Sequence, residues 1–237
     1  MSPTASALRT ARPVRVAIGP HVLAVDLAVP EDARGFVVFA HGSGSSRFSP
    51  RNRYVADTLH EHRLATLLID LLTEEEEQRD ERSGRLRFDI RMLADRLVAV
   101  CNWAKHVPEL RGLQVGLFGA STGGGAALLA AAQQPHAVHA IVSRGGRPDL
   151  AGAALTRVMA PTLLIVGERD EQVIELNQRA MSQMRGEVRL EIVPRATHLF
   201  EEAGALEQVA ALASDWFTAH LGRDRQDGRD GRNIPGR

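Results

Sequence analysis

The amino-acid sequence predicts an α/β fold, with a mostly parallel central sheet and helices on both of its faces. Short apolar runs recur along the chain, and stretches with apolar residues at helical spacing separate them. The run at residues 35–40 is apolar at every position, which is typical of a parallel strand buried on both faces. The 237 residues, 44% of them hydrophobic, are enough for one such domain with a large core.

The first two predicted strands differ from the others because only a short turn joins them. Residues 14–18 and 22–29 flank Gly19-Pro20-His21, a pattern that favours an antiparallel pair. Buried strands are then expected at 35–40, 64–69, 113–118, 140–143, 161–166 and 188–193. Helices are expected at 50–61, 89–106, 126–133, 150–158, 173–184 and 206–221, with Asp89 as the cap of the second.

Charged and polar segments lie outside these elements. Residues 73–87 contain four consecutive glutamates and predict a solvated loop. We expect a flexible N-terminus at 1–13 and a single domain at 14–221. Residues 222–237, rich in Gly, Arg and Asp, have almost nothing to bury and predict a disordered tail.

Composition excludes several classes of protein. The 29 basic residues balance 29 acidic ones, so the positive surplus that nucleic-acid binding needs is missing. A single cysteine, Cys101, can form neither an intrachain disulfide nor a cysteine-based metal site. No apolar run approaches the ~20 residues of a membrane span, and no secretory signal is recognisable. We therefore expect a cytoplasmic protein that uses no metal or other cofactor and binds no membrane; its oligomeric state stays open.

The sequence Gly119-Ala120-Ser121-Thr122-Gly123 lies between a predicted strand and a predicted helix. In this context Gly-x-Ser-x-Gly is the pattern of a nucleophile elbow, a tight turn that lifts the serine hydroxyl clear of the backbone. The helix that follows presents its N–H groups and its positive end to developing negative charge. We predict that Ser121 is a nucleophile; a plain helix cap is the alternative.

A serine nucleophile needs a base and a group that orients the base. Asp170 and His198 each follow one of the last two predicted strands, and the order Ser, Asp, His is the expected one. We predict that they form a triad with Ser121. Glu168 is the rival for the acid, because it lies two residues before Asp170.

The chain resembles α/β-hydrolases, and within that fold it is similar to the dienelactone-hydrolase-like family. The motifs at 119–123, 167–170 and 196–198 carry this resemblance, which extends over about 14–221. It implies the α/β-hydrolase fold. Dienelactone hydrolases proper have cysteine at the position of Ser121. The 144–160 connection is too short for a lid domain, so we expect none.

The resemblance also implies an oxyanion hole made by the N–H groups of Ser43 and Thr122, which would stabilise a tetrahedral intermediate. Gly42 and Gly44 would let a substrate carbonyl approach the backbone. His41 is interpreted as a structural residue that holds this loop. A phosphate cradle is the alternative for the loop, but no Gly-Lys-Ser/Thr follows it.

Arg47, Arg51, Arg144 and Arg147 fall on loops at the edge of the predicted site. One interpretation pairs them with surface carboxylates. In the other, Arg47, Arg144 and Arg147 bind an anionic group of the substrate.

We therefore predict a serine hydrolase that cleaves a carboxylic ester or a related acyl compound through an acyl-enzyme, with a small-molecule acyl substrate as its partner. A thioesterase, amidase or acyltransferase would use the same triad. The other alternative is a non-catalytic binding or accessory protein. Similar domains occur joined to phosphoribosyltransferases, although we expect no such segment here.

Overall fold

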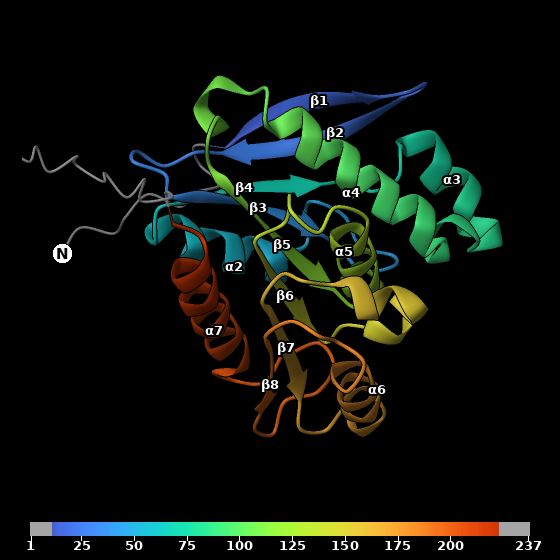
Figure 1. Cartoon of the computed structure of the whole chain (residues 1–237). Coiled ribbons are helices and arrows are strands. Elements are labelled where there is room, and N and C mark those ends of the chain that lie inside the picture. Colours follow the sequence, from blue (N-terminus) through green and yellow to red (C-terminus); the bar gives the residue numbers. More distant parts are fainter. Residues whose placement is uncertain (1–10, 223–237) are drawn as a thin grey trace, which may run out of the picture.

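The computed structural model describes residues 11–222, which are built around an eight-stranded sheet with the order β1-β2-β4-β3-β5-β6-β7-β8 (Figure 1). The strands are β1 (Arg12–Ile18), β2 (His21–Ala28), β3 (Gly35–Ala40), β4 (Leu64–Ile69), β5 (Gln114–Ala120), β6 (Ala140–Arg144), β7 (Thr162–Gly167) and β8 (Val188–Val193). β2 is antiparallel to β1 and to β4, and the other neighbours are parallel. The predicted mostly parallel α/β fold is confirmed.

Helices cover both faces of the sheet (Figure 1). One face carries α2 (Pro50–Glu61) and α7 (Ala205–His220), and the other carries α4 (Ile90–Ala104), α5 (Thr122–Gln133) and α6 (Glu171–Met181). α3 (Glu74–Ser83) and the short 3-10 helices η1 (Leu86–Phe88), η2 (Pro108–Leu110) and η3 (Pro148–Arg157) complete the described elements. Asp89 caps α4 as predicted, because its carboxylate accepts a hydrogen bond from the N–H of Met92 at 3.0 Å.

The side chains of the central strands pack into two hydrophobic cores, one on each face of the sheet. Successive side chains of a strand point to opposite faces. In β3, Phe36 and Val38 pack into the core under α4 and α5, whereas Val37 and Phe39 pack into the core under α2 and α7. Burying a large apolar side chain contributes about 1.5–3 kcal/mol. This double burial explains why the run is apolar at every position.

The prediction of a solvated loop at 73–87 is wrong, because residues 74–83 form α3. Thr73 and Glu76 make a capping box: Glu76 N–H donates to Thr73 Oγ1 at 3.3 Å, and Thr73 N–H donates to Glu76 Oε2 at 2.8 Å. Burial alone would raise the pKa of Glu76, but hydrogen bonds from Arg96 of α4 and from Thr73 outweigh it and lower the pKa to about 2. The acidic run is therefore a capped helix anchored to α4 by a buried ion pair.

The predicted domain limits change slightly. Arg12 and Pro13 already pair with Leu27 and Asp26, so the predicted flexible N-terminus is too long, and its residues 1–10 lie outside the described part. Gly222 donates its N–H to Gln114 Oε1 at 3.0 Å, while 223–237 of the predicted tail lie outside the described part. Within the described chain, no helix has the length and apolar character to cross a bilayer.

The connection between β6 and β7 contains only η3, which lies against α5 and α6, so there is no lid domain, as predicted. The carboxyl ends of the parallel strands β3 and β5–β8 gather at one edge of the sheet. In folds of this kind ligands bind at that edge.

Candidate active site

Ser121 adopts a backbone conformation that side-chain-bearing residues rarely take, with φ 50° and ψ −121°, at the junction of β5 and α5. Such a conformation costs about 1–3 kcal/mol and persists only where surrounding contacts hold it. The Ser121 N–H donates to the carbonyl of Arg144 at 3.2 Å, and its own carbonyl accepts from the N–H of Arg147 at 3.0 Å. The end of β6 and the loop after it thus hold the turn.

Gly119 and Gly123 are required by the close approach of α5 to the sheet. A Cβ on Gly123 would lie 2.3 Å from the carbonyl oxygen of Ala40, and one on Gly119 would lie 2.5 Å from the carbonyl oxygen of Gly123. α5 begins at Thr122, four residues before its predicted start. The glycines at the start of α5 lower its helix propensity, but they allow the helix to pack close against the sheet.

His198 and Asp170 are joined by a hydrogen bond of 2.6 Å between Nδ1 and Oδ2. Asp170 lies just after β7, and His198 lies in the loop after β8. Because the carboxylate accepts, Nδ1 carries the proton and Nε2 of the neutral ring is left as a proton acceptor. Gly145, with φ 51°, lies beneath the imidazole, since a Cβ there would be 3.4 Å from Nδ1.

Glu168 has a different partner. Its Oε2 accepts a hydrogen bond of 2.6 Å from the N–H of Arg195, in the loop that precedes His198. Of the two acids that the sequence leaves open, Asp170 is therefore the one that contacts the histidine.

Ser121 and His198 line the same pocket of about 230 Å³, together with Ser43 and Arg144. The pocket opens at the sheet edge where the strand ends gather. The structure thus brings the predicted nucleophile and base to one cavity.

The two predicted oxyanion-hole residues are in direct contact. The N–H of Ser43 donates to Oγ1 of Thr122 at 2.9 Å. Thr122 is the first residue of α5, so its own N–H has no acceptor within the helix. The sequence does not predict this contact with the hydroxyl, because no local pattern links residues 79 positions apart. A substrate oxyanion that uses the Ser43 N–H would have to share it with Thr122.

His41 bridges the loop after β3 to the end of β4. Its Nδ1 donates to the carbonyl of Gly42 at 2.9 Å, and its Nε2 accepts from the N–H of Leu71 at 3.0 Å. Burial lowers the pKa of His41, with smaller opposing effects from Gly42 and Asp70. A neutral ring that donates and accepts fits the structural role predicted for it.

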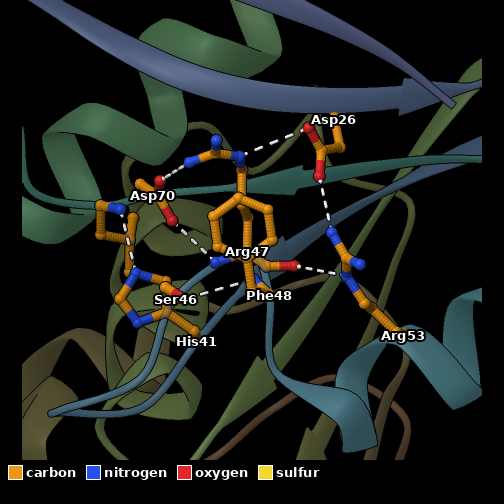
Figure 2. A network of polar contacts seen from close by, with 8 residues as sticks. Asp26, His41, Ser46, Arg47, Phe48, Arg53 and Asp70 are labelled. Atoms are coloured by element: carbon orange, nitrogen blue, oxygen red, sulfur yellow. Dashed lines mark hydrogen bonds and ion pairs between the residues drawn. The ribbon is translucent and has the colours of Figure 1, made fainter. Parts of the chain in front are cut away.

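Arg47 lies in a network of ion pairs (Figure 2). Its guanidinium pairs with Asp70 and, at 3.3 Å, with Asp26, and it stacks 4.0 Å from the ring centre of Phe48. Arg53 binds the other oxygen of Asp26 at 3.1 Å. For Arg47 the ion-pair interpretation therefore holds, and Arg47 is not part of the lining of the Ser121 pocket.

The other two predicted substrate-binding arginines also differ from each other. Arg147 forms a two-point contact with Asp149, at 2.8 and 2.7 Å, which raises the pKa of Arg147. Among the described residues Arg144 has no carboxylate partner, and it lines the Ser121 pocket. The sequence could not separate them, because they lie three residues apart at the end of the same predicted strand, and only the fold decides which of them binds a carboxylate.

The single cysteine is remote from this chemistry. Cys101 is buried in α4, and burial raises the pKa of its thiol to about 12, so it stays protonated at neutral pH. In the described part of the chain, no group of three His, Cys, Asp or Glu side chains is placed to hold a metal ion.

Comparison with known sequences matches residues 24–221 to the model of the dienelactone hydrolase family. A protein of Mycobacterium tuberculosis strain H37Rv with the provisional name phosphoribosyl transferase is 60% identical over 208 residues. That match spans 88% of this chain but 46% of the relative, so the chain has about half the length of the curated relatives it matches.

Comparison with solved structures agrees with the sequence match. A crystal structure of dienelactone hydrolase from Anabaena variabilis is 58% identical, has a TM-score of 0.87, and is aligned over 90% of this chain and 99% of its own. Est1E from Butyrivibrio proteoclasticus is 16% identical, with a TM-score of 0.73 over 88% of this chain and 98% of its own, which shows a shared fold.

Acidification should destabilise the protein through His41. The unfolded chain binds a proton at this residue near pH 6.5, the folded chain only at lower pH, so the unfolding free energy falls as the pH drops below 6.5. Replacing His41 by Gln removes this contribution. Urea titrations between pH 7.5 and 5 should give a shallower pH dependence for His41→Gln than for the wild type. Parallel curves for the two proteins would contradict the neutral, buried state of His41.

Proposed function

Because the chain belongs to the dienelactone hydrolase family, we propose that it is a serine hydrolase that cleaves a carboxylic ester or a related acyl compound. The observation that carries the proposal is the strained Ser121 at the N-terminus of α5, in one pocket with a histidine that is bound to Asp170. A residue held in a sparsely populated conformation against its intrinsic preference favours a functional role for its side chain.

In the first half of the reaction, Ser121 Oγ attacks the carbonyl carbon of the ester while His198 Nε2 takes the hydroxyl proton. Asp170 holds the ring in the required tautomer and stabilises the imidazolium. The tetrahedral intermediate collapses, the carbon–oxygen bond to the alcohol breaks, and His198 returns the proton to the leaving oxygen. The products of this half are an alcohol and an acyl ester on Ser121.

In the second half, a water molecule attacks the acyl carbon and His198 takes its proton. The bond to Ser121 Oγ then breaks, His198 protonates that oxygen, and the carboxylic acid leaves. The N–H groups of Thr122 and Ser43 face the oxyanion in both halves, and one such donor is worth about 3–4 kcal/mol. The Thr122 hydroxyl keeps the Ser43 N–H bonded until an oxyanion competes for it.

Thioester, amide and acyl-transfer chemistry would use the same groups, so a panel of matched ester, thioester and amide substrates is the way to rank them. An accessory role is the second candidate, and the length of the relatives favours it: the chain corresponds to 46% of a larger protein. The name of that relative refers to the whole protein, of which this chain matches less than half.

Replacing Ser121 by Ala should lower kcat for p-nitrophenyl butyrate by about 10⁴-fold or more, because it removes the hydroxyl proposed to attack the carbonyl. Thermal unfolding should stay cooperative, and Ser121→Ala should lose the covalent labelling by a fluorophosphonate that the wild type shows. Esterase activity that survives in the folded variant would refute the proposed mechanism. An accessory protein would show neither turnover nor labelling in the wild type.

The two acids after β7 provide an internal control. Asp170→Asn should lower kcat by about 10³–10⁴-fold, because an amide in place of the carboxylate favours the wrong tautomer of His198. Glu168→Gln should cost less than tenfold, since Glu168 binds the Arg195 N–H instead. Steady-state kinetics of both variants, with circular dichroism as the folding check, decide between them. A larger loss in Glu168→Gln would show that the acid is misassigned.

A further inference from the structure

Arg144 is a buried cation without a counter-ion. Its residue is 7% exposed, and its Nε and Nη1 atoms are inaccessible to solvent and have no hydrogen-bond acceptor. Over residues 11–222, no carboxylate lies within ion-pair distance of its guanidinium. Native proteins rarely leave buried donors of this kind without a partner.

Two other arginines near this site differ from Arg144 because carboxylates bind them. Arg47 and Arg147 are bound by carboxylates, as described above. Arg51 lies in the lining of the same pocket and pairs with the exposed Glu201 at 3.1 Å, yet its Nε is also buried without an acceptor. Two arginines therefore line this cavity, and the guanidinium group of each has a buried donor without an acceptor.

This arrangement is costly for the free protein. A buried charge without a partner loses its hydration and gains no ion pair in return. Burial, together with repulsion from Arg51, lowers the pKa of Arg144 to about 10, which leaves it charged at neutral pH. An oxyanion in the pocket would compensate both the desolvation and the repulsion.

Arg144 lies beside the candidate nucleophile, so an oxyanion bound to Arg144 would belong to the molecule that reacts there. Arg144 is the last residue of β6 and the register partner of Ala120, the residue before Ser121. Its carbonyl accepts the Ser121 N–H, and its side chain lines the pocket that contains Ser121 and His198. The Phe200 ring lies 5.8 Å from the guanidinium carbon. An anion bound there would lie in the same pocket as a carbonyl at Ser121.

We propose that Arg144 binds an oxyanion group of the substrate, a carboxylate or a phosphate ester, and thereby selects anionic esters for hydrolysis. A guanidinium binds either group through two parallel N–H···O contacts, which fix its orientation as well as its charge. This inference rests on the proposed function of the same pocket, and it assigns Arg144 alone among the three arginines that the sequence singled out.

The kinetic test compares the anionic ester 3-acetoxybenzoate with its near-isosteric neutral amide, 3-acetoxybenzamide, and adds 3-acetoxyphenyl phosphate as the ester that carries a phosphate. Arg144→Gln should lower kcat/KM at least tenfold for one or both anionic esters and less than twofold for the amide. The anionic ester with the larger loss identifies the group. Monophenyl glutarate against phenyl butyrate repeats the comparison with the charge on the acyl side.

Two variants serve as matched controls. Arg147→Gln removes a guanidinium that Asp149 already holds, and Arg179→Gln removes an exposed one on α6. Both should keep the wild-type preference for the anionic ester. Equal losses on charged and neutral esters in Arg144→Gln, or a selective loss in Arg147→Gln instead, would overturn the assignment.

Stability gives a readout that does not depend on turnover. Arg144→Met removes the uncompensated charge and keeps an apolar stem of similar length, so Tm should stay the same or rise. A guanidinium that served only the fold would have partners to lose, and the variant would then melt several degrees lower. Such a decrease would contradict the inference.

Binding separates this inference from the proposed function. In Ser121→Ala, isothermal titration with 3-hydroxybenzoate and with the neutral 3-hydroxybenzamide should show at least tenfold tighter binding of the carboxylate, lost on adding Arg144→Gln. If the wild type hydrolyses no ester but this preference persists, the proposed function fails and the anion site stands. If the wild type hydrolyses esters but neither kinetics nor binding depends on charge, the anion site alone is refuted.

Discussion

The approach of α5 to the carboxyl ends of β3 and β5 is the constraint on which the rest of the site depends. A turn this tight leaves no room for a Cβ at Gly123, where the Ala40 carbonyl would be 2.3 Å away, and it forces Ser121 into a left-handed conformation. The strain is small beside the burial of the apolar strands around it. The sheet therefore acts as a rigid frame that projects one hydroxyl at the N-terminus of a helix.

The same frame links catalysis to recognition. The backbone of Arg144 holds the Ser121 turn through its carbonyl, and the same residue lines the pocket beside that turn. Gly145, the next residue, lies under the His198 ring. One short segment after β6 thus supports the candidate nucleophile, the candidate base and an uncompensated positive charge. A protein that only needed stability would gain by replacing that buried charge with an apolar side chain.

Much of this arrangement could be predicted from local sequence patterns. The central strand at 35–40 is visible as an unbroken apolar run, and Ser121, Asp170 and His198 follow predicted strands in the expected order. Contacts between distant segments could not be predicted. The glutamate run at 74–77 lies in a helix whose Glu76 accepts a hydrogen bond from Arg96, twenty residues away in the sequence. In the same way, the sequence does not distinguish Arg47, Arg144 and Arg147. In the folded protein Arg47 and Arg147 bind carboxylates, and no carboxylate of the described residues pairs with Arg144.

We propose that an ester is cleaved through an acyl group carried by Ser121. Mixing the wild-type protein with excess p-nitrophenyl butyrate, quenching with acid in the millisecond range and analysing the protein by mass spectrometry would trap that intermediate. We expect a burst of p-nitrophenol no larger than one equivalent of enzyme and a butyryl group on the proteolytic peptide that contains Ser121. Steady turnover with the acyl group on another residue, or on none while a burst is present, would contradict it.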